Sequence, residues 1–183
     1  MLCYNIYSGD TIALPMRFFM PRASAVSADF PQRGHDHSAC GSHALLEAEA
    51  VCRSRQVKLT DLRRKVLETI WEDHAPMGAY DILAKLNAEG ERNAPMAVYR
   101  ALDFLIENGL VHRLSSLNAY IGCRHPGRSH SGQFLICSQC NIVAEITSEA
   151  VSKTVARAAT SRGFKPSGEI VEVMGLCPHC RGN

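Results

Sequence analysis

The sequence predicts an α/β (α+β) protein in which a winged helix-turn-helix domain precedes a small α/β domain with a four-cysteine metal site. Helical apolar spacing runs through residues 43–108, and two short β-rich runs follow it. Two Cys-x-x-Cys pairs then flank a last stretch of strand and helix patterns. We therefore expect three parts: a disordered or poorly ordered tail over residues 1–42, the winged-helix domain over 43–121 and the α/β domain over 122–183.

The length and composition allow one or two small domains, because a chain of 183 residues with 46% hydrophobic residues can bury a sizeable core. The formal net charge is only +2, so binding to nucleic acid requires local clusters of basic residues. One such cluster lies in the first half of the chain, although a run of this kind is equally compatible with a solvated helix face. Its members are Arg53, Arg55, Lys58, Arg63, Arg64 and Lys65.

The eight cysteines would suggest disulfides if the protein were secreted. Four of them fall into the two Cys-x-x-Cys pairs, however, and residues 1–20 lack the basic start of a signal peptide. Charged and polar residues interrupt the rest of the chain, so we expect no membrane span. These features favour a cytoplasmic, reducing compartment in which the thiols bind metal.

The end of the expected tail, residues 35–43, contains three histidines and one cysteine and could bind metal weakly. It lacks the apolar pattern that would fix the geometry of a site. A disordered, histidine-bearing tail is therefore the favoured interpretation.

Two helices are expected next. The first runs from His43 to about Gln56. The second begins with Thr60 as N-cap and Asp61 in its first turn, where a negative charge is favourable. It stops at residues 74–76, where a proline follows. Its apolar face consists of Leu62, Val66, Leu67, Ile70 and Trp71.

A third helix over residues 79–86 and a fourth that begins at Pro95 complete the helical part. Proline suits the first helical turn because its missing N–H would have no partner there. Asn108 and Gly109 end the fourth helix, since glycine can adopt the left-handed conformation. The buried face of this helix is expected to comprise Val98, Ala101, Leu102, Leu105 and Ile106.

The fourth helix also has side chains that point away from its apolar face. Tyr99 and Arg100 are of the kind that a recognition helix presents to the major groove. An ordinary exposed helix surface would show the same periodicity. Two β-rich runs, residues 110–114 and 119–123, follow as a hairpin and complete the winged helix-turn-helix pattern. The outward-facing set is Met96, Ala97, Tyr99, Arg100 and Asp103.

The composition changes beyond Cys123, where a polar loop leads into strand and helix patterns. Ser148 is placed to cap a helix over residues 149–161. Val151 and Val155 would form the inner face of this helix, together with Ala158 or Ala159. The expected strands are residues 134–136, 142–146 and 169–174.

The four paired cysteines, Cys137, Cys140, Cys177 and Cys180, can fill a tetrahedral zinc shell with no open position. The interval between the pairs exceeds the about 15–20 residues of an ordinary zinc ribbon, so a folded unit must lie between them. A redox dithiol is the alternative. It normally needs one pair at a helix N-terminus, whereas two strand-adjacent pairs favour structural zinc.

A second set of metal-ligand types remains: His112, Cys123, His130 and Glu145. A thiolate among nitrogen and oxygen ligands favours zinc over iron(II) or manganese. Taken singly, His112 is better explained as a solvent-facing strand histidine, and His130 as a loop histidine. His125 lies in the same loop and could replace His130.

Five segments occur in a specific order and spacing: residues 59–60 with Arg63, 79–83, 98–105, 109–112 and 134–140. They resemble the ferric uptake regulator (Fur) family of bacterial metalloregulators over about residues 43–182. Residues 120–123 and 175–180 are most similar to its zinc uptake regulator branch. One departure is Ala97, which stands where the family usually has Thr or Ser and removes one hydroxyl that could contact phosphate.

The resemblance implies a zinc-responsive transcriptional repressor that binds palindromic operator DNA as a homodimer and controls zinc-uptake genes. One structural zinc and one regulatory zinc per chain are expected, the latter at His112, Cys123, His130 and Glu145. The alternative is a sensor of iron, manganese, nickel or peroxide in the same family. The residues expected at the DNA are Tyr80, Met96, Ala97, Tyr99, Arg100 and Arg63.

We expect no enzymatic activity and no small-molecule substrate. The sequence contains no Ser-His-Asp pattern, phosphate-binding loop or His-Glu-x-x-His motif that would indicate a catalytic site. The remaining alternative outside this family is a zinc-stabilised adaptor or a thiol oxidoreductase without a role at DNA.

Overall fold

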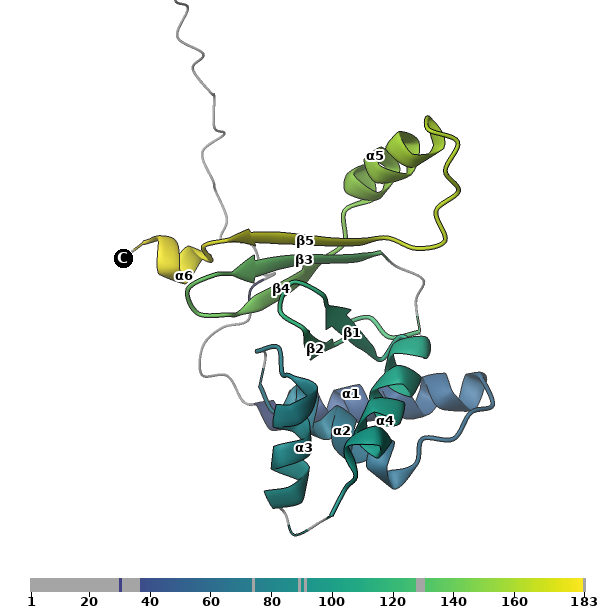
Figure 1. Cartoon of the computed structure of the whole chain (residues 1–183), viewed down its shortest axis with the longest axis vertical. Helices are drawn as coiled ribbons and strands as arrows, with labels where there is room; N and C mark the ends of the chain where they lie inside the picture. Colours follow the sequence, from purple (N-terminus) through teal and green to yellow (C-terminus); the bar gives the residue numbers. More distant parts are fainter. Residues whose placement is uncertain are drawn as a thin grey trace, which may run out of the picture.

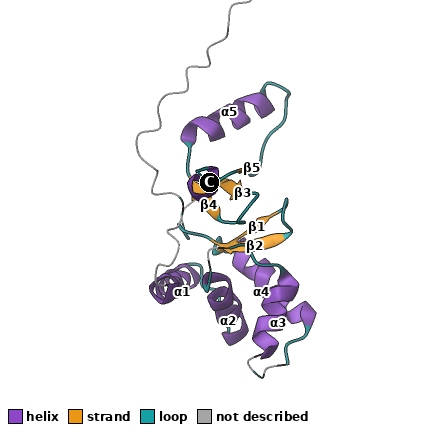
Figure 2. Cartoon of the chain, turned by 90° about the vertical axis from the view of Figure 1, so that its left-hand side faces the viewer, coloured by secondary structure: helices purple, strands orange, loops and turns teal. Residues whose placement is uncertain are grey.

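The computed structural model describes residues 30, 37–73, 75–88, 90, 92–127 and 131–182. A helical half lies on one side of the molecule and a three-stranded sheet on the other, with a two-stranded hairpin between them (Figures 1 and 2). In the described part of the chain, no helix is both long and apolar enough to cross a membrane. The elements of the first half are α1 (His37–Ser54), α2 (Asp61–Trp71), α3 (Ala79–Ala88), α4 (Pro95–Glu107), β1 (Val111–Leu114) and β2 (Ala119–Gly122).

The core of the helical half forms where the apolar stripes of α1 to α4 meet, with α2 in contact with each of the other three helices. The expected buried face of α4 is confirmed for all its members except Ile106, which is half-buried. Gly109 ends this helix with a φ of +66°, the left-handed conformation expected of it. The fully buried large side chains of this core are Leu67, Ile70, Ile82, Leu86, Leu102 and Leu105.

Two details of the helical half differ from the sequence prediction. Helix α1 begins at His37, so residues 37–42 belong to this helix and not to the expected tail. Thr60 occupies the N-cap position of α2, but its side chain makes no capping hydrogen bond. Its carbonyl oxygen instead accepts the first helical bond, from the N–H of Arg64 at 2.9 Å.

The hairpin β1–β2 is antiparallel, as expected, and pairs His112 with Ile121 and Leu114 with Ala119. Its turn closes through a bond from the N–H of Asn118 to the carbonyl of Ser115, with Asn118 at a positive φ of 47°.

The second half consists of a sheet in the order β4-β3-β5, with one long crossover. Strand β3 pairs antiparallel with β4 and parallel with β5, and α5 lies in the connection between β4 and β5. The elements are β3 (Gly132–Cys137), β4 (Val143–Ile146), α5 (Glu149–Thr160), β5 (Ile170–Gly175) and α6 (Pro178–Arg181).

Helix α5 begins as predicted, because the hydroxyl of Ser148 accepts a bond from the N–H of Val151. The prediction that Val151, Val155 and Ala158 or Ala159 form a buried inner face is wrong for a single chain. No residue of α5 is buried, and Val155 is 39% exposed. The helix stands away from the sheet, so its apolar side chains have no core to enter within the described chain (Figure 1).

The hairpin docks on the sheet through a shared apolar cluster. Leu114, Leu117 and Ile121 from the hairpin region pack with Phe134 and Ile136 of β3 and with Val143 of β4. Because both halves contribute to this cluster, the hairpin is the structural link between the helices and the sheet.

Candidate metal and nucleic-acid sites

The four paired cysteines meet at one end of the sheet. One sulfur from each of Cys137, Cys140, Cys177 and Cys180 lies within 4.8 Å of the others. The parallel pairing of β3 with β5 aligns Cys137 with Gly175, and this register brings the turn after β3 beside the start of α6. The prediction that a strand-helix-strand unit separates the two pairs is confirmed by β4, α5 and β5.

Backbone N–H groups point at the sulfurs of this cluster. The N–H of Cys177 donates to the Sγ of Cys137 at 3.4 Å, and this bond is the main cause that lowers the pKa of the Cys137 thiol to about 6. Further N–H donors from Cys140 and Gln139 act in the same direction. Burial raises the pKa of Cys180 to about 12, and bonds to the neighbouring thiols add to this shift.

The donor set fits a zinc ion. Four sulfurs at one point, with N–H groups that stabilise thiolate, form the closed shell typical of structural zinc. Phe30 and Ile142 pack against the cluster.

A second cluster joins the hairpin to the sheet. His112 on β1, Cys123 just after β2 and Glu145 on β4 each bring one ligand atom within 4.8 Å of the others. The Nε2 atom of His112 lies 3.1 Å from Oε1 of Glu145, whose side chain is only 3% exposed. The other oxygen, Oε2, accepts a bond from the N–H of Arg124 at 2.9 Å.

The electrostatics of Cys123 favour a bound cation. Burial, and after it the charge of Glu145, raise the pKa of its thiol to about 12, against the opposing effect of the N–H of His125. Without metal the thiol is therefore protonated near neutral pH. A divalent cation beside the sulfur would reverse this preference and favour the thiolate.

Of the expected regulatory ligands, the structure brings together His112, Cys123 and Glu145. His130 lies outside the described residues. His125 is exposed, and its backbone contributes to the surroundings of the Cys123 sulfur.

The sequence did not identify Trp71 as a neighbour of this cluster. Its indole lies against Gly122, the residue before Cys123. Trp71, Cys123 and Arg124 line a cavity of about 290 Å³. The signal in the sequence was Gly122, because a glycine directly before a candidate ligand indicates that another side chain can approach closely there. Trp71 is the one tryptophan of the chain. The other lining residues are Cys40, His43, Ala44, Glu47 and Pro126.

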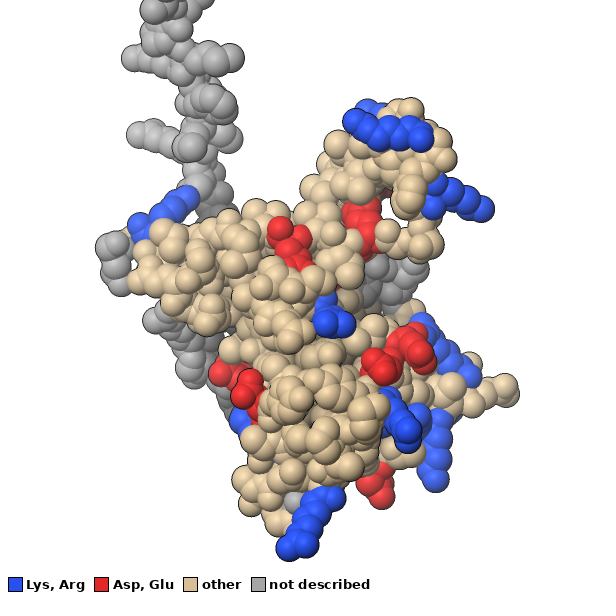
Figure 3. All heavy atoms as spheres, viewed as in Figure 1, with Lys and Arg blue, Asp and Glu red and all other residues tan. Residues whose placement is uncertain are grey.

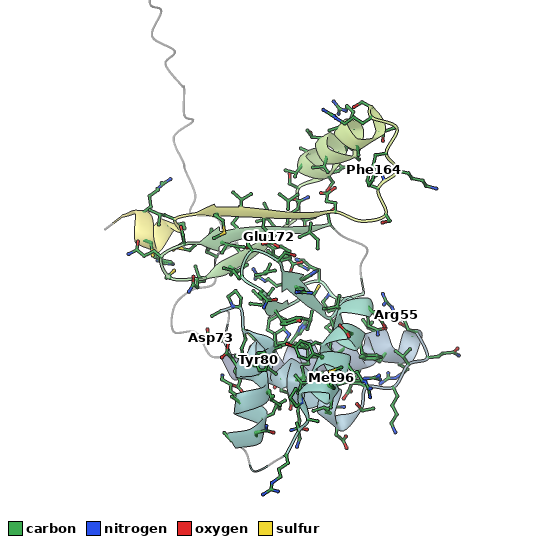
Figure 4. The ribbon with its side chains drawn as sticks, in the orientation of Figure 1. Arg55, Asp73, Tyr80, Met96, Phe164 and Glu172 are labelled. Atoms are coloured by element: carbon green, nitrogen blue, oxygen red, sulfur yellow. The ribbon has the colours of Figure 1, made fainter. Side chains whose placement is uncertain are left out.

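The candidate nucleic-acid surface lies on α3 and α4 in the helical half, where Figure 4 labels Tyr80 and Met96. Tyr80 is 71% exposed, and its ring meets the edge of Tyr99 at 6.4 Å between centroids. Met96 is 62% exposed and Arg100 is exposed, whereas Ala97 is half-buried. Lys and Arg side chains project from the outer edge of the helical half in Figure 3.

Arg63, expected at the DNA, has contacts within the helical half. Its guanidinium lies over the ring of Phe104, 3.5 Å from the centroid. It also donates to the carbonyl of Lys58 at 2.5 Å. The sequence did not predict this packing role, which combines a cation–π contact with a hydrogen bond.

Comparison with known proteins gives consistent results. Residues 54–174 match the model of the ferric uptake regulator family. The chain is 36% identical over 137 residues to the zinc uptake regulation protein of Escherichia coli (strain K12), covering 74% of this chain and 80% of that protein.

Two solved structures are also similar. A zinc uptake regulator complexed with zinc and DNA aligns with a TM-score of 0.74 at 34% identity, covering 78% of this chain and 95% of that one. The crystal structure of holo XcZur aligns with a TM-score of 0.72 at 38% identity, covering 78% and 99% of the two chains.

Proposed function

The chain belongs to the ferric uptake regulator family, and we propose that it is a zinc-responsive transcriptional repressor that controls zinc-uptake genes. The observation that carries this proposal is the cluster of His112, Cys123 and Glu145, which joins the hairpin to the sheet. The thiol of Cys123 and the similarity to zinc uptake regulators favour zinc as the signal over iron, manganese, nickel or peroxide.

We assign one structural and one regulatory zinc to each chain. The four-cysteine cluster would hold the structural ion and supply folding free energy to the second half. The regulatory ion would be held by His112, Cys123 and Glu145, with His130 proposed as the fourth ligand. Cys123 gives up its thiol proton on binding, and Glu145 stays oriented by the N–H of Arg124.

The position of this cluster explains how zinc would change DNA affinity. His112 lies on the hairpin, Cys123 directly follows it and Glu145 lies on the sheet, so a shared cation would stabilise the docked arrangement of the two halves. The cation can increase the free energy of DNA binding only by the amount by which it binds the docked arrangement more tightly than other arrangements. This difference is typically about 1–3 kcal/mol. DNA must then increase the affinity for zinc by the same factor.

We propose that the second half, residues 122–183, mediates homodimer formation. Strand β5 is an edge strand, and α5 has no buried residue, so a partner of the same kind can cover both. Phe164 follows α5 and is largely exposed (Figure 4). The exposed large apolar side chains of this region are Val155, Phe164, Ile170, Val173, Met174 and Leu176.

A two-fold dimer presents the same helix twice, and the operator should therefore be palindromic. Within the winged-helix domain, residues 43–121, α4 would enter the major groove with Tyr99 and Arg100 toward the bases. Met96 and Tyr80 flank them on the same exposed surface. Members of this family are transcription regulators, and we propose no catalytic role for this chain.

The proposal is tested by titrating the purified protein with zinc against a labelled AT-rich palindromic duplex, with iron(II) and manganese in parallel and metal content measured before and after. We expect one tightly bound zinc before titration and a second zinc that confers operator binding. An equal response to iron(II) or manganese would assign the protein to another metal. No binding with any metal would refute a role at DNA.

A further inference from the structure

The turn of the hairpin is fastened to the sheet by a second carboxylate. Oε1 of Glu172 accepts a bond from the N–H of Ser115 at 2.7 Å, and Oε2 accepts one from the N–H of Ser116 at 2.9 Å. Glu172 lies on β5 and Figure 4 shows it on the hairpin side of the sheet. Each carboxylate oxygen therefore binds one of two successive backbone donors, and charge-assisted bonds of this kind are stronger than neutral ones.

The sheet presents three functional side chains in one row. Phe134 on β3 is paired in register with Glu145 on β4 and with Glu172 on β5. Paired residues point to the same face of a sheet, and neighbouring strands are about 4.8 Å apart. The two carboxylates thus stand about 10 Å apart with the Phe134 ring between them.

The hairpin offers matching partners along its length. His112, near the start of β1, meets Glu145, and its ring lies 5.2 Å from that of Phe134. Ser115 follows three residues later, about 10 Å along an extended strand, where it meets Glu172. The metal cluster and Glu172 therefore hold opposite ends of the same hairpin.

We propose that Glu172 is a positioning residue that fixes the orientation of the DNA-binding half together with the regulatory metal. This inference rests on the proposed function. Without Glu172, the hairpin is held to the sheet by the metal cluster and by the apolar contacts of Leu114, Leu117 and Ile121. Apolar contacts are not directional, whereas the two hydrogen bonds of Glu172 fix the position of the turn. Glu172 thereby increases the fraction of zinc-loaded protein in which both recognition helices match the operator.

Glu172→Gln tests this role with almost no change of shape. The amide keeps one acceptor oxygen and places an NH₂ group against a backbone N–H, so one of the two bonds is lost. We expect operator affinity of the zinc-saturated full-length dimer to fall about tenfold, with two zinc ions still bound per chain. Glu72→Gln is the matched control and should leave operator affinity unchanged. Its carboxylate pairs with Lys85 on α3, outside both metal clusters and outside the proposed dimer face.

A substitution at Ser116 tests the same contact from the hairpin side. Ser116→Pro removes the N–H that binds Oε2, and proline suits this second position of the turn because Asn118 is the only turn residue with positive φ. Ser116→Ala keeps the N–H but removes the hydroxyl, which also bonds the Glu172 carboxylate, so the difference between the Pro and Ala variants isolates the contribution of the N–H. The Pro variant combined with Glu172→Gln should lose less affinity than the two single losses added, since both weaken the same contact between residue 172 and the turn.

Amide hydrogen exchange distinguishes the local loss of these hydrogen bonds from a loss of overall stability. In Glu172→Gln, the N–H groups of Ser115 and Ser116 should exchange faster while those of the α2 core keep their protection. Unchanged operator affinity and unchanged exchange at both serines would overturn the positioning role, even if the wild-type protein responds to zinc. Absence of a zinc response in the wild-type protein would instead refute the proposed function itself.

Discussion

The indole of Trp71 lies directly over Gly122, so that a side chain at residue 122 would overlap the ring. This contact joins the end of α2 to the residue before the candidate ligand Cys123. The absence of a Cβ at residue 122 therefore allows the helical half to approach the metal cluster closely.

Gly122→Ala should consequently disturb both packing and metal binding. We expect a loss of about 1–3 kcal/mol in the free energy of unfolding, because an added methyl group forces the indole to move. Thermal denaturation of the zinc-loaded protein measures the loss, and emission of the single tryptophan reports the displacement. Gly41→Ala, on α1 with open space around its Cα, is the control and should not destabilise the protein. Equal stability of the two variants would contradict the close approach.

Cys123→Ser should separate regulation from folding. The variant is expected to form a folded dimer with its structural zinc, but without the about 5- to 150-fold gain in operator affinity that one metal coupling typically provides. Fluorescence anisotropy with a labelled operator, with and without added zinc, measures the gain. A normal zinc response in this variant would show that the regulatory site lies elsewhere.

Cys137→Ser should have the opposite pattern. It removes one of four sulfurs from a site that supplies folding free energy, and its sulfur is the acceptor of the Cys177 N–H. We expect a loss on the order of several kcal/mol in stability, since zinc-binding free energies in small structural sites are about 10–16 kcal/mol. Calorimetry and zinc analysis check this result. Wild-type stability with a full zinc complement would disprove the structural assignment.

Zinc binding at the regulatory cluster should become tighter as pH rises. The pKa of Cys123 is raised to about 12, so the thiol holds its proton throughout the neutral range and must release it to bind zinc. Below that pKa each unit of pH increases the thiolate fraction about tenfold, which predicts a slope of about one log unit in zinc affinity per pH unit from this group.

Competition with a chromophoric chelator, calibrated at each pH between about 7.5 and 9, measures this slope. Cys123→Ser is the control and should lose it. A zinc affinity that does not change with pH in the wild-type protein would mean that no thiol proton is displaced.

Local patterns accounted for much of the fold. Pro95 and Gly109 mark the ends of α4, Ser148 caps α5, and β-rich runs mark the strands, because each depends on neighbours within a few residues. The paired cysteines also identified their own cluster, since each Cys-x-x-Cys is a local turn. The start of α1 was placed six residues late because residues 37–42 have little apolar periodicity.

By itself the sequence determined the order of elements and the types of ligand available, because capping, periodicity and side-chain chemistry are local properties. The family resemblance grouped His112, Cys123 and Glu145 as one site, but only the tertiary structure decided how these ligands meet and what surrounds them. The approach of His112, Cys123 and Glu145, and the row of Glu145, Phe134 and Glu172, depend on strand register and on docking of the hairpin. Strand register and hairpin docking are set by apolar packing between distant segments, which residue spacing along the chain does not encode.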